Sequence, residues 1–460
     1  MFKRNIITEL EKWSKKKGRK PLVLRGARQV GKTTVVSEFA KQFDQYIYLN
    51  LEVPYDREAF ENFENMEDFL QSIFFLKDKA YAKRNKTLIF IDEIQEVPEA
   101  LNILRFFYEQ TPQIPVIAAG SLLETIFNNK MNFPVGRVEF MVMRPVSFTE
   151  FLAACNEIQA LEQLQHVPLK NFAHQKLLHL FHTYALIGGM PEVVQNYAQN
   201  KDLSALVSMY DSLLTAYFDD VEKYADNNTQ LQVIRHLVKS CFFEAGKRIK
   251  FQGFAKSAYG SKEIGDAFRT LEKTMLINLV YPCTGSNLPM LPEIKKSPRL
   301  HVLDTGLMNY MLGLQKEMLG KDDLSAVYQG TLIEHLVGQE LMSNQYNALG
   351  SLNFWVREKN SSMAEVDYVI AWQGKLIPIE VKSGKEGKLK SLHLFMDEAK
   401  HPFAVRFYAG EFSLIEATSS KGKKYHLLNL PYFLVSQLPH YLEWMVKELE
   451  KLGDKKLKKK

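Results

Sequence analysis

The first third of the chain alternates short apolar runs with segments of helical periodicity. This alternation is typical of parallel β-strands joined by crossover helices. We therefore expect a parallel α/β sheet within residues 21–150. Its predicted strands are PLVLRG (21–26), YIYLNLE (46–52), TLIFIDE (87–93) and PVIAAGS (115–121).

The pattern changes twice further along the chain. From Phe151 to Lys247 long stretches have the spacing of amphipathic helices. Residues 248–306 combine short helices with two strand-like runs, LINLVYPC and RLHVLD. The remainder, residues 307–460, predicts a helix, GTLIEHLVGQELMSN, and then three strands, NFWVREK, EVDYVIAW and KLIPIEVKS.

Composition narrows the class of protein without naming a function. The 460 residues are 46% hydrophobic and 24% charged, which excludes a largely disordered chain or a fibre. No apolar run approaches the length of a membrane-spanning helix, and the N-terminus lacks a signal-peptide core, so we expect a cytoplasmic protein with no membrane contact. The three cysteines lie far apart, and the net charge of +6 is modest. Lysines at both ends predict solvated tails, with a contact to nucleic acid as the second interpretation.

A phosphate-binding loop follows the first predicted strand. The octet fits G-x-x-x-x-G-K-[ST] and opens a helix, which is the context that the motif requires. Glycines let the backbone N–H groups face an anion, Lys32 is expected to reach the β- and γ-phosphates, and Thr33 to offer its hydroxyl to Mg²⁺. The predicted ATP-binding residues here are Gly26, Ala27, Arg28, Gln29, Val30, Gly31, Lys32, Thr33 and Thr34.

Two carboxylates end the strand TLIFI. A buried parallel strand delivers such residues to the sheet edge where ligands bind. Asp92 is predicted to join Thr33 in holding Mg²⁺, directly or through water. Glu93 is predicted to orient and deprotonate the attacking water.

Three further residues are candidates for the same site. Ser121 follows a buried strand and either positions the γ-phosphate or its water, or caps the next helix. Arg137, in a segment expected to be an exposed loop, is predicted to neutralise transition-state charge as a catalytic arginine, in cis or from a neighbouring subunit. Arg144 is the weaker candidate for that role.

These motifs resemble those of the prokaryotic AAA-type P-loop ATPases with an uncharacterised C-terminal region. The resemblance rests on RGARQVGKTT, LIFIDEIQEVP, AAGS, GRVEF and GGMPEVV. It implies a P-loop ATPase core in residues 1–150, a helical lid in residues 151–247 and a sensor role for Ser121. GGMPEVV also has a purely structural interpretation, a helix stop followed by a helix that begins with proline.

The middle segment, residues 248–306, is similar to a winged helix. A short helix at 251–258, a turn and a helix at 262–273 are followed by two strands that flank a wing. Basic residues of the second helix and the wing, including Arg299, would then face DNA. The alternative is a packing module that binds no nucleic acid, because the same helix carries acidic residues.

A second group of charged residues lies in the C-terminal part. Asp367 and Glu380 fall on consecutive strands whose hairpin pairing would bring them together, and Glu380 shares a strand face with Lys382. Paired carboxylates can hold Mg²⁺ or Mn²⁺ and polarise a phosphodiester, with Glu334 completing the metal shell. Glu365 is expected to meet solvent. The order helix Glu, strand Asp and E-x-K resembles the restriction-endonuclease-like PD-(D/E)XK core, which implies such a domain in residues 307–460.

The sequence thus predicts a four-part α/β protein with ATP and Mg²⁺ as cofactors. The leading hypothesis is an ATPase whose C-terminal nuclease-like domain binds or processes DNA. The alternative is a slow nucleotide-dependent switch or assembly protein whose C-terminal domain binds only a protein partner. Both hypotheses leave open whether the chain forms a homo-oligomer.

Overall fold

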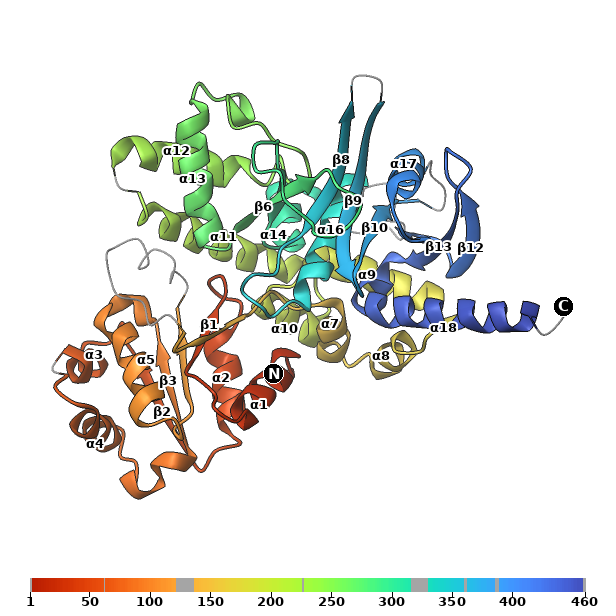
Figure 1. Cartoon of the computed structure of the whole chain (residues 1–460). Coiled ribbons are helices and arrows are strands. Elements are labelled where there is room, and N and C mark those ends of the chain that lie inside the picture. Colours follow the sequence, from red (N-terminus) through yellow and green to blue (C-terminus); the bar gives the residue numbers. More distant parts are fainter. Residues whose placement is uncertain are drawn as a thin grey trace.

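The structure of the chain is a computed structural model that describes residues 2–61, 63–120, 136–225, 227–315, 330–359, 362–384 and 389–457. In Figure 1 the N-terminal α/β sheet lies at the lower left, the long C-terminal sheet at the right, and helices lie between and above them. Within the described part of the chain, no helix combines the length and apolar character that crossing a membrane requires.

The N-terminal domain is built on a five-stranded sheet in which every pair of neighbours is parallel. The strand order is β2-β3-β4-β1-β5, so β1 lies between β4 and β5. This confirms the predicted parallel sheet. The strands are β1 (Leu22–Arg25), β2 (Gln45–Asn50), β3 (Thr87–Asp92), β4 (Val116–Ala119) and β5 (Glu139–Val142).

Successive residues of β3 enter two different hydrophobic cores. Leu88 and Phe90 pack with the core that includes α1 and α2, whereas Ile89 and Ile91 pack with the core that includes α4 and α5. A strand that is buried on both faces has an unbroken run of apolar residues in its sequence. This run is why TLIFI could be identified as a strand. The helices of this domain are α1 (Ile6–Lys15), α2 (Lys32–Ala40), α3 (Pro54–Glu61), α4 (Met66–Leu76) and α5 (Glu99–Gln110).

The fifth strand corrects one expectation. The segment around Arg137 was predicted to be an exposed loop, yet Glu139–Val142 forms β5 and pairs in parallel with the whole of β1. Only Val142 of the four residues is fully buried, because β5 is the edge of its sheet. A strand this short and this exposed carries little hydrophobic signal in its sequence.

Residues after the sheet are helical, as predicted. α7 begins with a capping box in which Ser147 and Glu150 satisfy each other's backbone N–H groups. α9 ends at Ile187 and α10 begins at Pro191, so GGMPEVV is indeed a helix stop followed by a proline-started helix. The helices are α7 (Phe148–Ala154), α8 (Ile158–Leu164), α9 (His174–Ile187), α10 (Pro191–Asn200), α11 (Val207–Glu222), α12 (Asn228–Ser240) and α13 (Ser261–Lys273).

The C-terminal half is built on an eight-stranded mixed sheet of order β12-β13-β11-β10-β9-β8-β6-β7. Its elements are β6 (Ile277–Cys283), β7 (Arg299–Val302), α14 (Thr305–Met311), α16 (Gly330–Ser343), β8 (Asn353–Lys359), β9 (Ser362–Trp372), β10 (Lys375–Val381), α17 (Lys390–Glu398), β11 (Phe403–Tyr408), β12 (Ser413–Thr418), β13 (Lys424–Pro431) and α18 (Leu438–Leu457).

The middle segment is continuous with its neighbours. β6 and β7 pair antiparallel, as expected for strands that flank a wing, and β6 also pairs in parallel with β8 of the C-terminal sheet. The predicted helix at 251–258 was wrong, because only a 3-10 turn at Phe254–Lys256 forms there. On the other side α13 packs on α12, across the predicted boundary at residue 247. The four-part division of the chain therefore stays a prediction.

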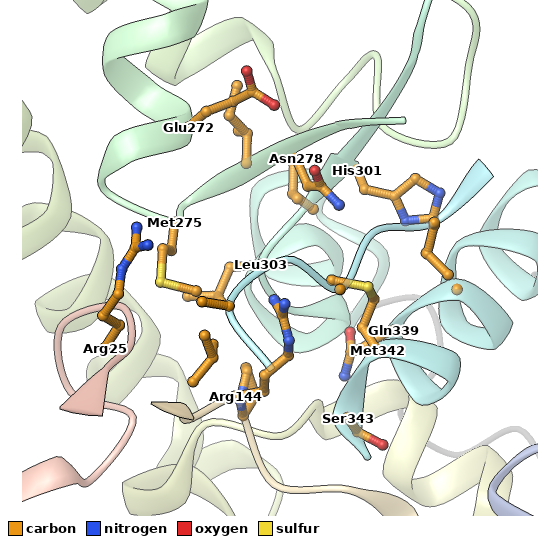
Figure 2. Close-up of a pocket in the computed structure, with 18 of the residues that line it drawn as sticks. Arg25, Arg144, Glu272, Met275, Asn278, His301, Leu303, Gln339, Met342 and Ser343 are labelled. Atoms are coloured by element: carbon orange, nitrogen blue, oxygen red, sulfur yellow. The ribbon is translucent and has the colours of Figure 1, made fainter. Parts of the chain in front are cut away.

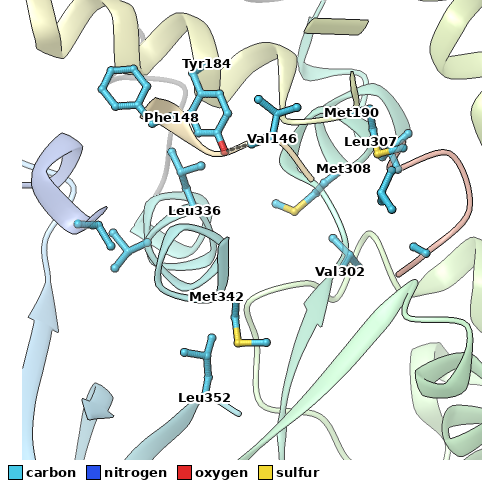
Figure 3. Close-up of a cluster of buried hydrophobic side chains, with 14 of the residues drawn as sticks. Val146, Phe148, Tyr184, Met190, Val302, Leu307, Met308, Leu336, Met342 and Leu352 are labelled. Carbon is cyan, nitrogen blue, oxygen red and sulfur yellow. Dashed lines mark hydrogen bonds between the residues drawn. The ribbon is translucent and has the colours of Figure 1, made fainter. Parts of the chain in front are cut away.

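A buried junction joins the lid helices to the C-terminal half (Figure 3). A Cβ added to Gly188 would come within 2.2 Å of the Asp304 carboxylate, and the Gly189 N–H donates to that carboxylate at 2.5 Å. On α16, the Glu340 carboxylate lies 3.0 Å from the backbone N of Phe148 and 2.7 Å from the Tyr184 hydroxyl. Two carboxyl groups thus sit in the packed interior between the two halves.

Burial makes this junction sensitive to pH. It raises the pKa of Glu340 from its ordinary value of 4.5 to about 7. The folded state therefore binds the proton more tightly than the unfolded state. The resulting stabilisation is complete below about pH 4.5 and is lost as the pH rises through 7.

We predict that Glu340→Gln weakens the pH dependence of stability, because Gln mimics the protonated carboxyl. By linkage, Glu340 should lower the free energy of unfolding of the wild-type protein by about 2.5 kcal/mol between pH 5 and pH 8, and the variant should lack this decrease. Thermal unfolding across that pH range measures the difference. Glu162→Gln, at an exposed position of α8, should keep the wild-type profile. An unchanged pH profile in Glu340→Gln would contradict the prediction.

Candidate functional site: the P-loop pocket and the C-terminal carboxylates

The phosphate-binding loop connects β1 to α2. Gly31 caps α2 with φ of 93°, a left-handed conformation that favours glycine. A Cβ on Gly26 would lie 2.6 Å from the carbonyl oxygen of Met143, so the loop passes tightly against the end of β5. The two glycines of the motif therefore shape the loop, and the N-terminus of α2 provides a favourable dipole for an anion.

Lys32 is folded back into the loop that it belongs to. Its side chain is 7% exposed, and its Nζ donates to the carbonyl oxygens of Gly26 at 2.8 Å and Ala27 at 3.1 Å. Burial lowers its pKa, against the opposing charges of Glu93 and Asp92. The ammonium group is thus held within the loop, where phosphate oxygens can replace the carbonyl groups as its partners.

Thr33 and Asp92 meet at the end of β3. The Thr33 hydroxyl donates to Asp92 Oδ2 at 2.7 Å, and the Tyr48 hydroxyl lies 3.4 Å from the same oxygen. Asp92 is 3% exposed, and burial raises its pKa. A hydroxyl and a carboxylate this close are hard oxygen donors that fit Mg²⁺, which usually takes one or two protein ligands together with substrate phosphates.

Glu93 adopts a left-handed conformation, with φ of 50°, at the start of a 3-10 turn. Gln95, which the sequence analysis did not single out, donates to Glu93 Oε2 at 2.6 Å. Asn156 and Lys201 have similar left-handed backbones, so this conformation fixes the position of Glu93 and does not by itself identify its role. Gln95 follows two residues later in IDEIQ, so its place in the motif was the available signal.

A pocket of about 720 Å³ opens over the loop. Arg28, Gln29, Gly31, Lys32, Thr33, Thr34 and Glu93 line one side of it, and Ala27 and Val30 are buried in the core beneath. The opposite wall comes from α10 and α11, through Pro191, Glu192, Gln195, Asn196, Gln199, Met209 and Ala216. The GGMPEVV segment therefore delivers α10 to the pocket, which no local pattern could show.

Ionic contacts attach the loop to the surrounding helices. Arg28 pairs with Asp220 of α11 at 3.0 Å, and its carbonyl accepts from Tyr217 at 2.5 Å. Arg4, near the N-terminus, donates to the carbonyl of Val30 at 3.1 Å. Sequence reasoning missed these partners, because they lie far from the loop along the chain.

The remaining ATPase candidates have different outcomes. Arg137 pairs with Glu109 at 3.3 Å and is absent from the lining of the pocket, so its catalytic role stays a prediction. Ser121 lies outside the described residues. Arg144 lines a separate cavity.

The C-terminal candidates gather as predicted. β9 and β10 pair antiparallel, and the backbone N–H of Val381 donates to Asp367 Oδ2 at 2.8 Å. Lys382 Nζ lies 2.6 Å from Glu380 Oε1, so these two side chains do point the same way. Burial, then the charge of Asp367, raises the pKa of Glu380 to about 8 and that of Glu334 on α16 to about 7.

An arginine that we expected on the wing occupies the middle of this cluster. Arg299 of β7 has a side chain that is 4% exposed, with Nη1 3.9 Å from Glu334 Oε2 and Nη2 3.6 Å from Asp367 Oδ1. It also pairs with Glu365, which was expected to meet solvent. The expectation for Arg299 was wrong, because a buried guanidinium requires anionic partners, and Arg299 has them here and not on an exposed wing. Glu365, whose side chain is 31% exposed, meets solvent in part and also pairs with Arg299.

Arg299 changes what this group of carboxylates can hold. Its guanidinium supplies the positive charge that a divalent ion would otherwise bring. Among the residues that the structure describes, no cluster of three or more His, Cys, Asp or Glu side chains is arranged to hold a metal ion. The side chains around Arg299 form an internal ion-pair cluster, in which the guanidinium lies among Glu334, Glu365 and Asp367.

Comparisons with known proteins agree with the first domain and leave the others open. Residues 18–152 match the family of an AAA domain. Residues 178–318 and 329–427 match two domains of unknown function, DUF8612 and DUF4143. No curated protein is similar to this chain in sequence. Residues 18–152, with their P-loop and parallel sheet, therefore form an AAA-type P-loop domain.

Solved structures show distant likeness. The Walker-type ATPase PABY2304 of Pyrococcus abyssi matches 68% of this chain and 96% of its own, at 12% identity and a TM-score of 0.43. The Drosophila ORC bound to DNA matches 57% of this chain and 65% of its own, at 15% identity and a TM-score of 0.25. The Saccharomyces cerevisiae Hsp104–ADP complex matches 59% of this chain and 38% of its own, at 16% identity and a TM-score of 0.28.

Proposed function

We propose that this chain hydrolyses ATP with Mg²⁺ at the P-loop pocket and transmits the nucleotide state to its C-terminal half. The observation that carries the proposal is the 2.7 Å contact between Thr33 and Asp92, beside Lys32 and Glu93. The AAA domain match supports it independently.

Each residue has a distinct role in this proposal. Lys32 binds the β- and γ-phosphates, and Thr33 with Asp92 would hold Mg²⁺, which neutralises developing phosphate charge when bound. Glu93 orients a water molecule and accepts its proton, while Gln95 holds the Glu93 carboxylate in place.

Contacts around the pocket supply a route to the rest of the molecule. A nucleotide there would lie between the loop and the lid helices α10 and α11, which line the opposite wall. Arg28 and Asp220 join the loop to α11 directly. The lid in turn packs on the C-terminal half through Gly189, Asp304 and Glu340. A change at the γ-phosphate can therefore shift lid and C-terminal half together.

For the C-terminal half we propose a winged-helix-like module and a restriction-endonuclease-like domain that binds DNA without cutting it. The antiparallel β6–β7 pair after α13 supports the first, and the placement of Glu334, Asp367, Glu380 and Lys382 supports the second. The Arg299 ion pairs favour binding over cleavage, because cleavage of this type needs a metal ion at the carboxylates.

A second candidate is a nucleotide-dependent switch whose C-terminal half binds a protein. The wing between β6 and β7 exposes apolar side chains, Leu291 at 69% and Ile294 at 75%. Exposed apolar groups close together in sequence are more typical of a protein contact than of a DNA contact. Contact with a second copy of this chain would cover the same two apolar side chains.

The proposed role of Glu93 as the general base predicts a specific effect on the rate of ATP hydrolysis. Glu93→Gln should leave ATP binding intact and slow steady-state hydrolysis by about 10²-fold or more, because the variant cannot accept the proton. Phosphate release and ATP binding are measured on the same preparation. Glu96→Gln, three residues later and half-exposed, is the matched control and should retain the wild-type rate. Rapid turnover by Glu93→Gln would remove Glu93 from the role of base.

The C-terminal proposal predicts DNA binding without cleavage. Linear, supercoiled and single-stranded DNA should stay intact with Mg²⁺ or Mn²⁺, and binding should tighten as salt is lowered. Cleavage by the wild-type protein that Asp367→Ala abolishes would contradict the role that we give to Arg299. Failure to bind any DNA at low salt would favour the protein-binding switch.

A further inference from the structure

A second cavity, of about 330 Å³, lies where three parts of the chain meet (Figure 2). Arg25 and Arg144 reach it from the ends of β1 and β5, Glu272 and Asn278 from α13 and β6, and Gln339 and Ser343 from α16. It shares no lining residue with the P-loop pocket, and none of Glu334, Asp367 and Glu380 lines it. The proposed function so far gives this cavity no role.

Arg144 is the charged group that sets the chemistry of the cavity. Figure 2 shows its side chain pointing into the space between the walls. Its Nε is buried without a hydrogen-bond partner among the described residues. Burial and the charge of Arg25 lower the pKa of Arg144 to about 10. A guanidinium in this setting is costly unless an anion compensates it.

The other polar groups leave the cavity with a net positive wall. Glu272 is the acidic lining residue, and one of its oxygens accepts from the backbone N of Leu279 at 2.8 Å. His301 bonds to Tyr368 at 3.0 Å, and burial lowers its pKa, so it adds no charge at neutral pH. Arg25 and Arg144 are thus the two arginines of the lining, against one carboxylate, and Arg144 is the one whose buried Nε has no hydrogen-bond partner among the described residues.

The cavity also has neutral and apolar surface for the body of a ligand. Asn278 offers an amide from the wall opposite Arg144, and Ser343, which donates to the carbonyl of Glu340 at 2.8 Å, keeps its lone pairs as acceptors. Met275 and Met342 supply adaptable apolar surface. A volume near 330 Å³ is at the small end of ligand pockets.

We propose that this cavity binds a small organic phosphate, with the phosphate on Arg144 and Arg25 and the body of the ligand against Met275 and Met342. Arginine is the side chain best suited to phosphate, because its planar guanidinium donates two parallel hydrogen bonds. The polar side chain of Asn278 orients the ligand. The walls belong to the ATPase domain and to the C-terminal half, so a bound ligand bridges them.

The cavity is connected to the P-loop through the backbone. Arg25 immediately precedes Gly26, and its carbonyl accepts from the N–H of Met143 at 2.8 Å. Arg4 donates both to the carbonyl of Arg144 at 2.7 Å and to that of Val30 at 3.1 Å. A ligand that fixes the two arginines therefore acts on the loop that holds ATP. This regulatory part rests on the proposed ATPase function, and the binding part does not.

Calorimetric titration of the full chain tests the binding part, with ribose 5-phosphate and inorganic phosphate as probes. The Lys32→Ala background removes the lysine of the P-loop, which is the competing phosphate site. We expect ribose 5-phosphate to bind, and Lys32→Ala/Arg144→Gln to weaken that binding at least tenfold. Arg105→Gln, at an exposed arginine of α5, should leave it unchanged. Equal affinity for the two probes would identify free phosphate, and not an organic phosphate, as the ligand, and would overturn the role of the apolar wall.

Absence of binding at millimolar probe, or binding that Arg144→Gln leaves intact, overturns the proposal. If Arg144→Gln fails to fold, Asn278→Ala takes its place. This variant should bind ribose 5-phosphate several-fold more weakly than its parent protein. In the wild-type protein the probe should change the rate of ATP hydrolysis, and an unresponsive rate overturns the regulatory part alone. A protein that never hydrolyses ATP would refute the proposed function and leave the binding result standing.

Discussion

The hydrogen bond from Thr33 to Asp92 joins two elements on which the rest of the ATPase domain depends. Thr33 lies in the first turn of α2, and Asp92 ends β3, so the bond fixes the helix that carries the P-loop against the sheet edge that carries the acidic pair. Lys32 and Glu93 are the immediate neighbours of these two residues. One contact of 2.7 Å thus sets the spacing between Lys32, the proposed phosphate-binding residue, and Glu93, the proposed base.

A second constraint is the close packing of the turn between α9 and α10 against the C-terminal half. Glycine at 188 and 189 lets the turn between α9 and α10 approach Asp304 closely, and Pro191 then starts α10 in the lining of the P-loop pocket. The same short segment therefore touches the C-terminal half on one side and the P-loop pocket on the other. This arrangement places GGMPEVV on the route by which we propose that the nucleotide state reaches the C-terminal half.

Local signals in the sequence predicted most of the elements that position the site. The P-loop, β3 with its acidic end, and the hairpin of β9 and β10 combine strong periodicity with chemistry on adjacent residues, and all formed where expected. β5 was missed because an edge strand of four residues buries too little to show a pattern. Arg299 was misplaced because the anions that stabilise it lie on α16 and β9, and only the tertiary fold brings them together. The sequence could not predict the cavity around Arg144 for the same reason, because its walls come from segments hundreds of residues apart.

The claim that Lys32 binds the phosphates of ATP supports everything else, and a calorimetric titration of Mg·ATP into wild-type and Lys32→Ala protein tests it most directly. Lys41→Ala, at the far end of α2, is the control for loss of a lysine. We predict binding by the wild type and the control, and an affinity lower by roughly 10- to 100-fold in Lys32→Ala, the effect of losing charged hydrogen bonds. Equal affinity in all three proteins would contradict the account.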